Sequence, residues 1–281
     1  MFKFDLHLHS NNSDGSDTVE ELVQKITQKG IQIFALTDHD TVNGLEEIQK
    51  YIPKDIKFIN GVELTCKAQD IKCHILGYGI NPYNKDLVSL IKKGKKLRKQ
   101  KLETRIEYLK QNWNFEFTKE ELDWLYSRKS VVKTHIANIL VKRGLSDNNV
   151  DAMKKYLNGC KTGDTRFSGE EGISTIIKAG GIPVWAHPLG GEGEEHLSKE
   201  DFLPQLHTMI NVGIKGLECY YSRYSMNEIN FLRNCAKENK LVITGGSDYH
   251  GVNKTVPLGL LNSENKMILS DSVDIDKIIA L

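Results

Sequence analysis

The stretch Phe4-Asp5-Leu6-His7-Leu8-His9-Ser10, close to the start of the 281-residue chain, decides how the rest of the sequence is interpreted. In a β-strand alternate side chains point to the same face, so His7 and His9 would project together, away from the apolar side chains of the stretch. Histidine, aspartate and glutamate are common ligands of zinc, manganese and iron. Two adjacent imidazoles therefore predict half of a metal site, although a single His-x-His pattern is also found in surface strands.

The composition is typical of a cytoplasmic globular protein. The formal net charge is +1 and the isoelectric point about 7.6, so any site for a polyanion must be local. The sequence has no run of 18 apolar residues, and we expect no membrane span, signal peptide or transit peptide. The five cysteines show no C-x-x-C spacing and are expected to be reduced. Nothing indicates an obligate protein partner.

The order of the expected elements indicates an α/β fold. Apolar strands are expected at 31–36, 57–62 and 71–78, and again at 182–186, 215–219 and 241–244, with helical patterns between most of them. Strand–helix–strand alternation predicts a parallel sheet with right-handed crossovers, and we expect this sheet to close as a barrel.

Residues 84–167 show helical patterns and no strand pattern. We expect this segment to be a helical insertion in a discontinuous barrel made of 1–83 and 168–281. Between Lys92 and Lys101 seven of ten residues are basic and none is acidic. Such a run is either a solvated helix face or, through Arg98, a contact with a substrate phosphate.

Most of the nine histidines occupy one kind of position, at or just beyond a strand end or at a helix start. These are His7, His9, His39, His74, His135, His187 and His250, and Asp14, Glu63 and Asp248 lie in similar places. In a β/α barrel the carboxyl ends of the strands open onto one face, where active sites are built. We therefore expect these side chains to converge, although His187, in an Ala-His-Pro setting, could instead belong to a packed turn.

Five runs carry a close resemblance to a known family. They are Asp5-Leu6-His7-Leu8-His9-Ser10, Leu36-Thr37-Asp38-His39-Asp40, Gly61-Val62-Glu63, Ala186-His187-Pro188 and Gly246-Ser247-Asp248-Tyr249-His250-Gly251. In sequence and in order they resemble the PHP (polymerase and histidinol phosphatase) family, over essentially the whole chain. The resemblance implies a distorted seven-stranded, TIM-like β/α barrel with up to three divalent ions, most often manganese, with iron or zinc as alternatives.

The resemblance also implies the ligands of each ion. One ion would be held by His7, His9, Glu63 and Asp248. A second would be bridged by Glu63 and held by His74 and His135. A third would be held by Asp14, His39 and His250. Some members have histidine where Asp14 stands, and an oxygen ligand there is compatible with manganese or iron. We assign catalytic roles to His187 and Asp248, and phosphate binding to Arg98, Lys133 and His187.

The helical insertion narrows the resemblance to bacterial PHP phosphoesterases that act on nucleoside 3′,5′-bisphosphates or degrade short RNA from the 5′ end. Members often carry arginine where Lys133 stands, and a lysine offers a point charge in place of a bidentate fork. The expected substrate is a nucleotide or a short RNA or DNA oligonucleotide, with no membrane involved.

The expected chemistry also follows from charge. The positive charge of three divalent ions exceeds the negative charge of the ligands Asp14, Glu63 and Asp248. This excess of positive charge suits the binding of a phosphate ester, which a metal-activated hydroxide would attack. Asp5 and Asp38 would either orient neighbouring ligands or form ordinary turn hydrogen bonds.

Three other functions remain open from the sequence. A histidinol-phosphate-type phosphatase would need no basic insertion. An amidohydrolase-type barrel shares His-x-His but commonly needs a carbamylated lysine where Glu63 stands. A non-catalytic PHP module, binding metal and regulating a partner, would not need its complete set of ligands.

Overall fold

A computed structural model describes residues 1–128, 130–163, 166–192 and 194–279. Residues 129 and 164–165 of the expected insertion, and residues 193 and 280–281 of the expected barrel, lie outside the described residues. In the described chain seven strands follow one another in the sheet order β1-β2-β3-β4-β6-β7-β8. Their bounds are β1 Phe4–Asp5, β2 Ile33–Leu36, β3 Lys57–Ala68, β4 Ile71–Tyr78, β6 Ile182–Trp185, β7 Gly216–Tyr221 and β8 Val242–Gly246. A short β5, Phe167–Ser168, pairs with β3 outside this order.

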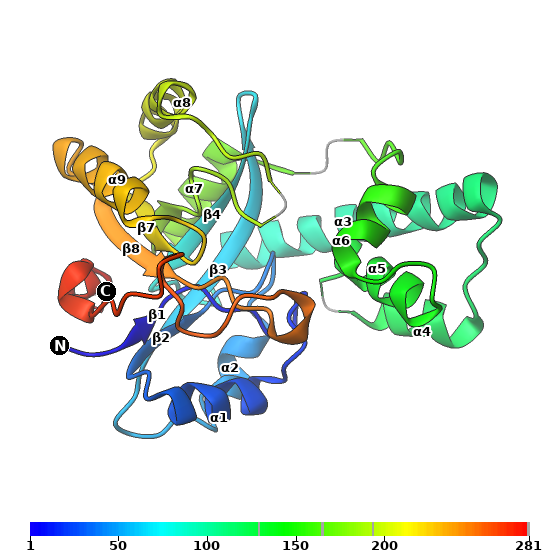
Figure 1. Ribbon diagram of the computed structural model, residues 1–281, viewed down its shortest axis with the longest axis horizontal. Coiled ribbons are helices and arrows are strands. Elements are labelled where there is room, and N and C mark those ends of the chain that lie inside the picture. The colour runs from blue at the N-terminus through cyan, green and yellow to red at the C-terminus, as the bar shows by residue number, and fades with distance from the viewer. Residues whose placement is uncertain (129, 164–165, 193, 280–281) are drawn as a thin grey trace.

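The two ends of this order meet, so the sheet is a nearly closed barrel (Figure 1). The Leu6 N–H donates to the Gly245 carbonyl at 3.2 Å, and the Asp248 N–H donates to the His7 carbonyl at 2.9 Å. An isolated parallel bridge joins Leu8 to Tyr249. The expected TIM-like α/β barrel is therefore confirmed, and its closure places the segments carrying His7 and Asp248 side by side.

β4 departs from the parallel arrangement that the alternation of elements predicts. It runs antiparallel to both β3 and β6, whereas the other neighbouring strands in the order are parallel. The reason is its connection, since only Gln69 and Asp70 separate β3 from β4, and such a short turn can join only antiparallel strands. Gln69 takes the positive φ of 53° that this turn requires. β3 continues past its expected end, so Glu63 lies within the strand.

Helices cover the outside of the barrel (Figure 1). They are α1 Val19–Lys29, α2 Gly44–Ile48, α7 Gly169–Lys178, α8 Lys199–Val212, α9 Met226–Glu238 and α10 Ile275–Ile279, with short 3-10 turns at Gly251–Asn253 and Ser270–Ser272. α1 shows how the sequence dictates them. Thr18 and Glu21 form a capping box at its start, and its buried stripe includes Leu22 and Ile26. None of the described helices is both long and apolar enough to cross a membrane.

The segment between the two parts of the barrel is helical and has its own hydrophobic cluster. It contains α3 Lys85–Trp113, α4 Lys119–Ser127, α5 Lys133–Lys142, α6 Asn149–Ala152 and a π-helical turn at Met153–Leu157. α3 runs from the barrel into this group of helices (Figure 1). Its Leu87 and Leu90 pack in the barrel core, and its Leu102 and Leu109 pack in the second cluster. The helix thus fixes the helical segment against the barrel.

The burial of the second cluster predicts how substitutions in the helical segment change the free energy of unfolding. Leu140 is completely buried within it, whereas Leu145, just beyond the end of α5, is 38% exposed. Leu140→Ala should lower the free energy of unfolding by about 2–5 kcal/mol, because it leaves a cavity in a packed core. Leu145→Ala should cost less than about 1 kcal/mol. Urea unfolding of both variants measures the difference, and equal losses would contradict this description of the cluster.

Candidate metal centre

Glu63 lies at the centre of the converging side chains. Its Oε2 atom is 3.2 Å from His7 Nε2, 3.1 Å from His9 Nε2 and 3.1 Å from His39 Nδ1. The same carboxylate presents its Oε1 atom to His74, at 3.0 Å from Nδ1. β3 carries Glu63 past the end of β2, where Leu36 pairs with Asn60, while β4 still runs alongside it. One carboxylate oxygen faces His7, His9 and His39, and the other faces His74.

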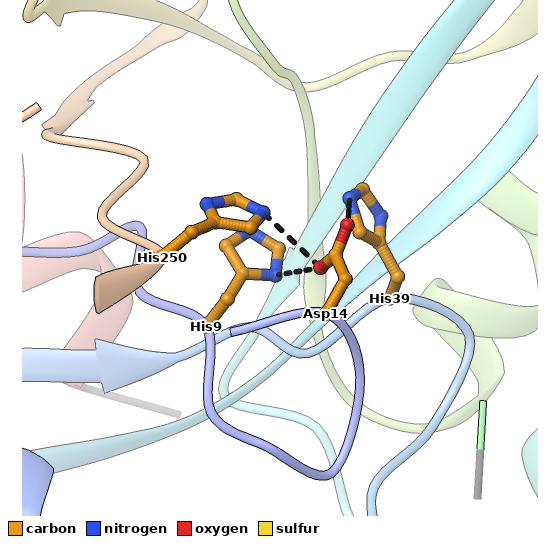
Figure 2. Close-up of side chains that lie close together, drawn as sticks. All are labelled: His9, Asp14, His39 and His250. Carbon is orange, nitrogen blue, oxygen red and sulfur yellow. Dashed lines mark ion pairs between the residues drawn. The ribbon is translucent and has the colours of Figure 1, made fainter. Parts of the chain in front are cut away.

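The described residues form three overlapping groups whose candidate ligand atoms lie within 4.8 Å of one another. The groups are His7, His9, Glu63 and Asp248; His39, Glu63 and His74; and His9, Asp14, His39 and His250. The first is the set that the sequence predicts for one ion. Figure 2 shows the third, with Asp14 between the rings of His9, His39 and His250. This third group contains the predicted Asp14, His39 and His250, and adds His9.

His135 is the predicted ligand that these groups do not include. It is buried in the first turn of α5, where its Nδ1 accepts a hydrogen bond from the Val132 N–H at 3.0 Å. Burial lowers the pKa of His135 to about 4, and the negative charge of Asp14 opposes this shift. In the second group His39 takes the place that the sequence assigns to His135. His135 therefore borders the centre from the helical segment.

The ligand atoms fit a divalent metal because they are buried and lack hydrogen-bond partners. These atoms are His7 Nε2, His9 Nδ1 and Nε2, Asp14 Oδ1, His39 Nδ1, Glu63 Oε1 and Oε2, and His250 Nε2. Buried polar atoms are nearly always satisfied, and each such exception calls for an explanation. Imidazole nitrogens and carboxylate oxygens are the donors that zinc, manganese and iron take, so divalent metal ions would satisfy these atoms.

The electrostatics of the two central carboxylates keep them ionised. Burial raises the pKa of Glu63, but the neighbouring imidazoles, His39 and His7 first, outweigh it and hold the pKa well below its usual range. Asp14 behaves in the same way, because His250 and His39 outweigh the effect of burial and its pKa lies well below the usual range. Both carboxylates are thus in the form that binds metal.

His7 and His9, which follow β1, have raised pKa values when no metal is bound. Burial lowers the pKa of His9, but the adjacent carboxylates of Asp248 and Glu63 raise it to about 9. For His7, burial is likewise outweighed by Glu218 and Glu63, and its pKa is raised well above the usual value. Metal binding at neutral pH therefore has to displace protons from this site.

Glu218 is a site residue that the sequence analysis missed. It is fully buried on β7, its Oε1 lies 2.9 Å from His7 Nδ1, and its Oε2 accepts from the His187 N–H at 2.8 Å. A carboxylate on the outer nitrogen of a metal-binding imidazole fixes the tautomer and orientation of the ring. The signal in the sequence is a single charged residue within 216–221, the stretch Gly-Leu-Glu-Cys-Tyr-Tyr.

The sequence allows two roles for Asp5 and Asp38, and in the structure each carboxylate accepts hydrogen bonds from a neighbouring loop. Asp5 accepts hydrogen bonds from the Ser247 backbone and hydroxyl, at 2.8 and 2.6 Å. Asp38 accepts from the Ser10 backbone and hydroxyl, at 2.8 and 2.7 Å. Each aspartate thus links two of the segments that carry ligands, and orients those ligands through the backbone.

His187 and Asp248 both combine a position at the centre with an unusual backbone. Their φ values are 29° and 60°, which non-glycine residues rarely adopt and which cluster at functional sites. His187 Nε2 lies 3.3 Å from His74 Nδ1, and both rings border a cavity of about 50 Å³ at the centre. Lys254, also missed in the sequence, donates to Asp248 Oδ2 at 2.7 Å.

The structure brings Arg98 to the edge of the centre and places Lys133 further into the helical segment. Arg98 forms an ion pair with Asp40, the residue after His39, and its Nη2 donates to Thr65 Oγ1 at 3.0 Å. Lys133 Nζ instead donates to Asn158 Oδ1 at 2.5 Å. Of the two phosphate contacts predicted in the helical segment, Arg98 is therefore the one that contacts the barrel.

Comparisons with known proteins agree with this fold and centre. The PHP domain model matches residues 5–164, more than half of the chain, so the protein belongs to the PHP domain family. It is similar to the 3′,5′-nucleoside bisphosphate phosphatase of Chromobacterium violaceum, with 28% identity covering 89% of this chain and 88% of that protein. The 5′-3′ exoribonuclease of Haemophilus influenzae is also 28% identical, over 96% of both chains.

A solved structure shares the whole fold. The crystal structure of a protein from Bifidobacterium adolescentis, described as a metal-dependent phosphoesterase, matches with a TM-score of 0.82. It is 27% identical in sequence, and the match covers 99% of this chain and 95% of the other. The helical segment is therefore part of the shared architecture together with the barrel.

The contact between Glu218 and His7 predicts an effect on metal affinity. Glu218→Gln keeps the size of the side chain but removes the charge that holds the His7 ring, so metal affinity should fall by about 10–100-fold. Glu238→Gln, at the exposed end of α9, is the matched control and should leave affinity unchanged. Competition with a chromophoric chelator measures both. Unchanged affinity in Glu218→Gln would show that the ring is oriented by other contacts.

Proposed function

We propose that this protein is a metal-dependent phosphoesterase that hydrolyses phosphate esters of nucleotides, either nucleoside 3′,5′-bisphosphates or the 5′ ends of short oligonucleotides. The observation that carries the proposal is the set of three overlapping ligand groups around Glu63 on one face of the barrel. The names of the similar proteins from Chromobacterium violaceum and Haemophilus influenzae support the same substrate class. The free cysteines suit a reducing cytoplasm as the location.

Three divalent ions, with manganese the first candidate and iron or zinc as alternatives, would match the three groups. Bound there, they would supply an activated water for attack on phosphorus and offset the charge of the phosphate. Glu63 is proposed as the bridging ligand, because its two oxygens face different imidazoles. His135 is proposed as a further ligand from the helical segment, through Nε2, because Val132 occupies its Nδ1.

The substrate phosphate is proposed to bind at the cavity lined by His74, His187, Asp248 and Lys254. His187 belongs to none of the three ligand groups, and its Nε2 lies 3.4 Å from Glu63 Oε1 and its Nδ1 3.5 Å from Glu194 Oε2. Its ring would contact the phosphate and move a proton at the leaving oxygen. Asp248 would act as a ligand whose second oxygen is held by Lys254 and by the Tyr221 hydroxyl, at 2.7 and 3.0 Å.

The segment 84–167 is proposed as an insertion that supplies a second phosphate site. Its separate hydrophobic cluster supports its treatment as a unit. Arg98 reaches the barrel beside the centre, and Lys133 begins the helix that carries His135. A phosphate held by these two cations would not be cleaved, and would position the one that is.

Replacement of Glu63 tests the metal chemistry. Glu63→Gln removes a charge shared by two ligand groups, so turnover of a nucleotide substrate should fall by at least about a hundredfold. Glu47→Gln on α2 is the control, since Glu47 is exposed and belongs to no ligand group. Phosphate release is measured for both variants, with circular dichroism to confirm folding. Comparable losses at both positions would indicate misfolding and not metal chemistry.

The two-phosphate site predicts substrate preference. A nucleoside 3′,5′-bisphosphate should be hydrolysed at least about tenfold faster than the matching 5′- or 3′-monophosphate, because positioning by a second phosphate contributes several kcal/mol. Arg98→Ala and Lys133→Ala should each remove much of this preference, while Lys142→Ala, exposed near the end of α5, should keep it. The measurement is phosphate release from the three nucleotides at fixed salt. Equal rates, unaltered by the substitutions, would favour a histidinol-phosphate-type phosphatase.

A further inference from the structure

A groove with a strongly basic wall lies between α3 and α4, outside the metal centre. It has a volume of about 690 Å³ and is lined on the α3 side by Lys92, Lys95, Lys96 and Lys99, and on the opposite side by Tyr126 and Arg128. We call these six residues and the space between them the basic groove. The four lysines follow the spacing i, i+3, i+4 and i+7, so they share one face of the helix.

The positive charge of the basic groove is not neutralised by the surrounding chain. Among the described residues, none of its four lysines forms an ion pair, whereas the adjacent Lys93, outside the groove lining, pairs with Glu171 at 2.8 Å. Glu103 is the one carboxylate among the described lining residues. Five cations against one acid create a local site for a polyanion on a chain whose net charge is only +1.

Aromatic rings accompany these charges. Lys99 Nζ lies 5.6 Å from the centre of the Tyr126 ring, and the Arg128 guanidinium lies 5.0 Å from that of Trp124. Tyr126 remains 46% exposed and Trp124 37% exposed. Exposed aromatic rings beside a track of cations are the arrangement that binds single-stranded nucleic acid, because bases stack on the rings while lysines face the backbone phosphates.

The basic groove is connected to the metal centre by direct contacts. Trp124 packs edge-on against His135, with ring centres 5.5 Å apart, and His135 borders the loop of Asp14. On the other wall, Arg98 projects from the same turns of α3 to the barrel at Asp40. The groove is therefore linked to the edge of the metal centre through His135 on one side and through Arg98 and Asp40 on the other.

We propose that the basic groove holds the nucleotides that follow the reacting nucleotide of a single-stranded oligonucleotide. This inference rests on the proposed function and adds the path of the strand. The lysines from Lys92 to Lys99 extend over about 10 Å of helix, enough to face more than one phosphate. A mononucleotide has no chain to fill the groove, so the groove discriminates between oligonucleotide and mononucleotide substrates.

The test compares two substrates in metal-loaded protein, an octaribonucleotide with a 5′-phosphate and a nucleoside 3′,5′-bisphosphate. The groove variant is Lys95→Gln/Lys96→Gln/Lys99→Gln, and its control is Lys119→Gln/Lys154→Gln/Lys237→Gln, three exposed lysines outside the groove lining. Glutamine preserves helix propensity, and both triple variants change the net charge equally. The ratio of kcat/KM for the octamer to that for the bisphosphate should fall at least about tenfold in the groove variant and stay constant in the control.

Direct binding separates this inference from the proposed function. The probe is an octamer with phosphorothioate linkages, which keep the charge and slow hydrolysis. Fluorescence anisotropy of this octamer measures its affinity for the groove independently of catalytic activity. The slope of log affinity against log salt should weaken by about two in the groove variant, at about 0.7 for each lost phosphate contact. Tyr126→Leu should weaken binding at least about fivefold, the lower end of the contribution of one stacked base.

Each other outcome has one meaning. If the octamer binds the wild type and the groove variant with equal affinity, the proposal that the groove binds the strand is wrong. The proposed function still holds in that case if the bisphosphate is hydrolysed. Octamer binding that depends on the groove, without hydrolysis of either substrate, supports the groove and contradicts the proposed function. Binding that survives Tyr126→Leu and is displaced equally well by inorganic polyphosphate would identify a general polyanion surface and overturn the assignment to a nucleic acid strand.

Discussion

The structure depends on one buried charge. Glu63 has none of its surface exposed, and the cost of burying a lone carboxylate amounts to several kcal/mol unless partners compensate it. Here the compensation comes from imidazoles on separate segments, with His7 and His9 from the segment after β1, His39 from the loop after β2 and His74 from β4. The barrel has to close, and β4 has to turn back along β3, for these rings to meet one carboxylate.

This constraint explains why the ligands could be predicted from the sequence. A ligand at the end of a strand needs only the local pattern to be recognised, and closure of the barrel brings all such ends to one face. The strand-end pattern predicted that such side chains converge, and the family resemblance implied His7, His9, Glu63 and Asp248 as one group, which the structure brings together. The helical segment was expected from its helical patterns.

The remaining features depend on contacts between distant segments, which a local pattern does not contain. The antiparallel β4 follows from a two-residue turn at Gln69 and Asp70, which the strand–helix alternation did not reveal. Glu218 reaches His7 only because barrel closure brings β7 and the segment after β1 close together. The position of His135 beside the ligand groups, and not within them, follows from the packing of α5, where Val132 engages its Nδ1. The basic run 92–101 lies on a helix, so its side chains point in different directions. Arg98 points to the barrel, whereas four lysines face the groove.

The central claim is that the side chains around Glu63 form a centre for several metal ions. Elemental analysis of the purified protein, produced with added manganese, iron or zinc, tests it most directly, together with turnover before and after treatment with a chelator. The account predicts about two to three equivalents of transition metal per chain, with activity lost to the chelator and restored by the metal. Less than about one equivalent per chain, with phosphate release unaffected by the chelator, would contradict it.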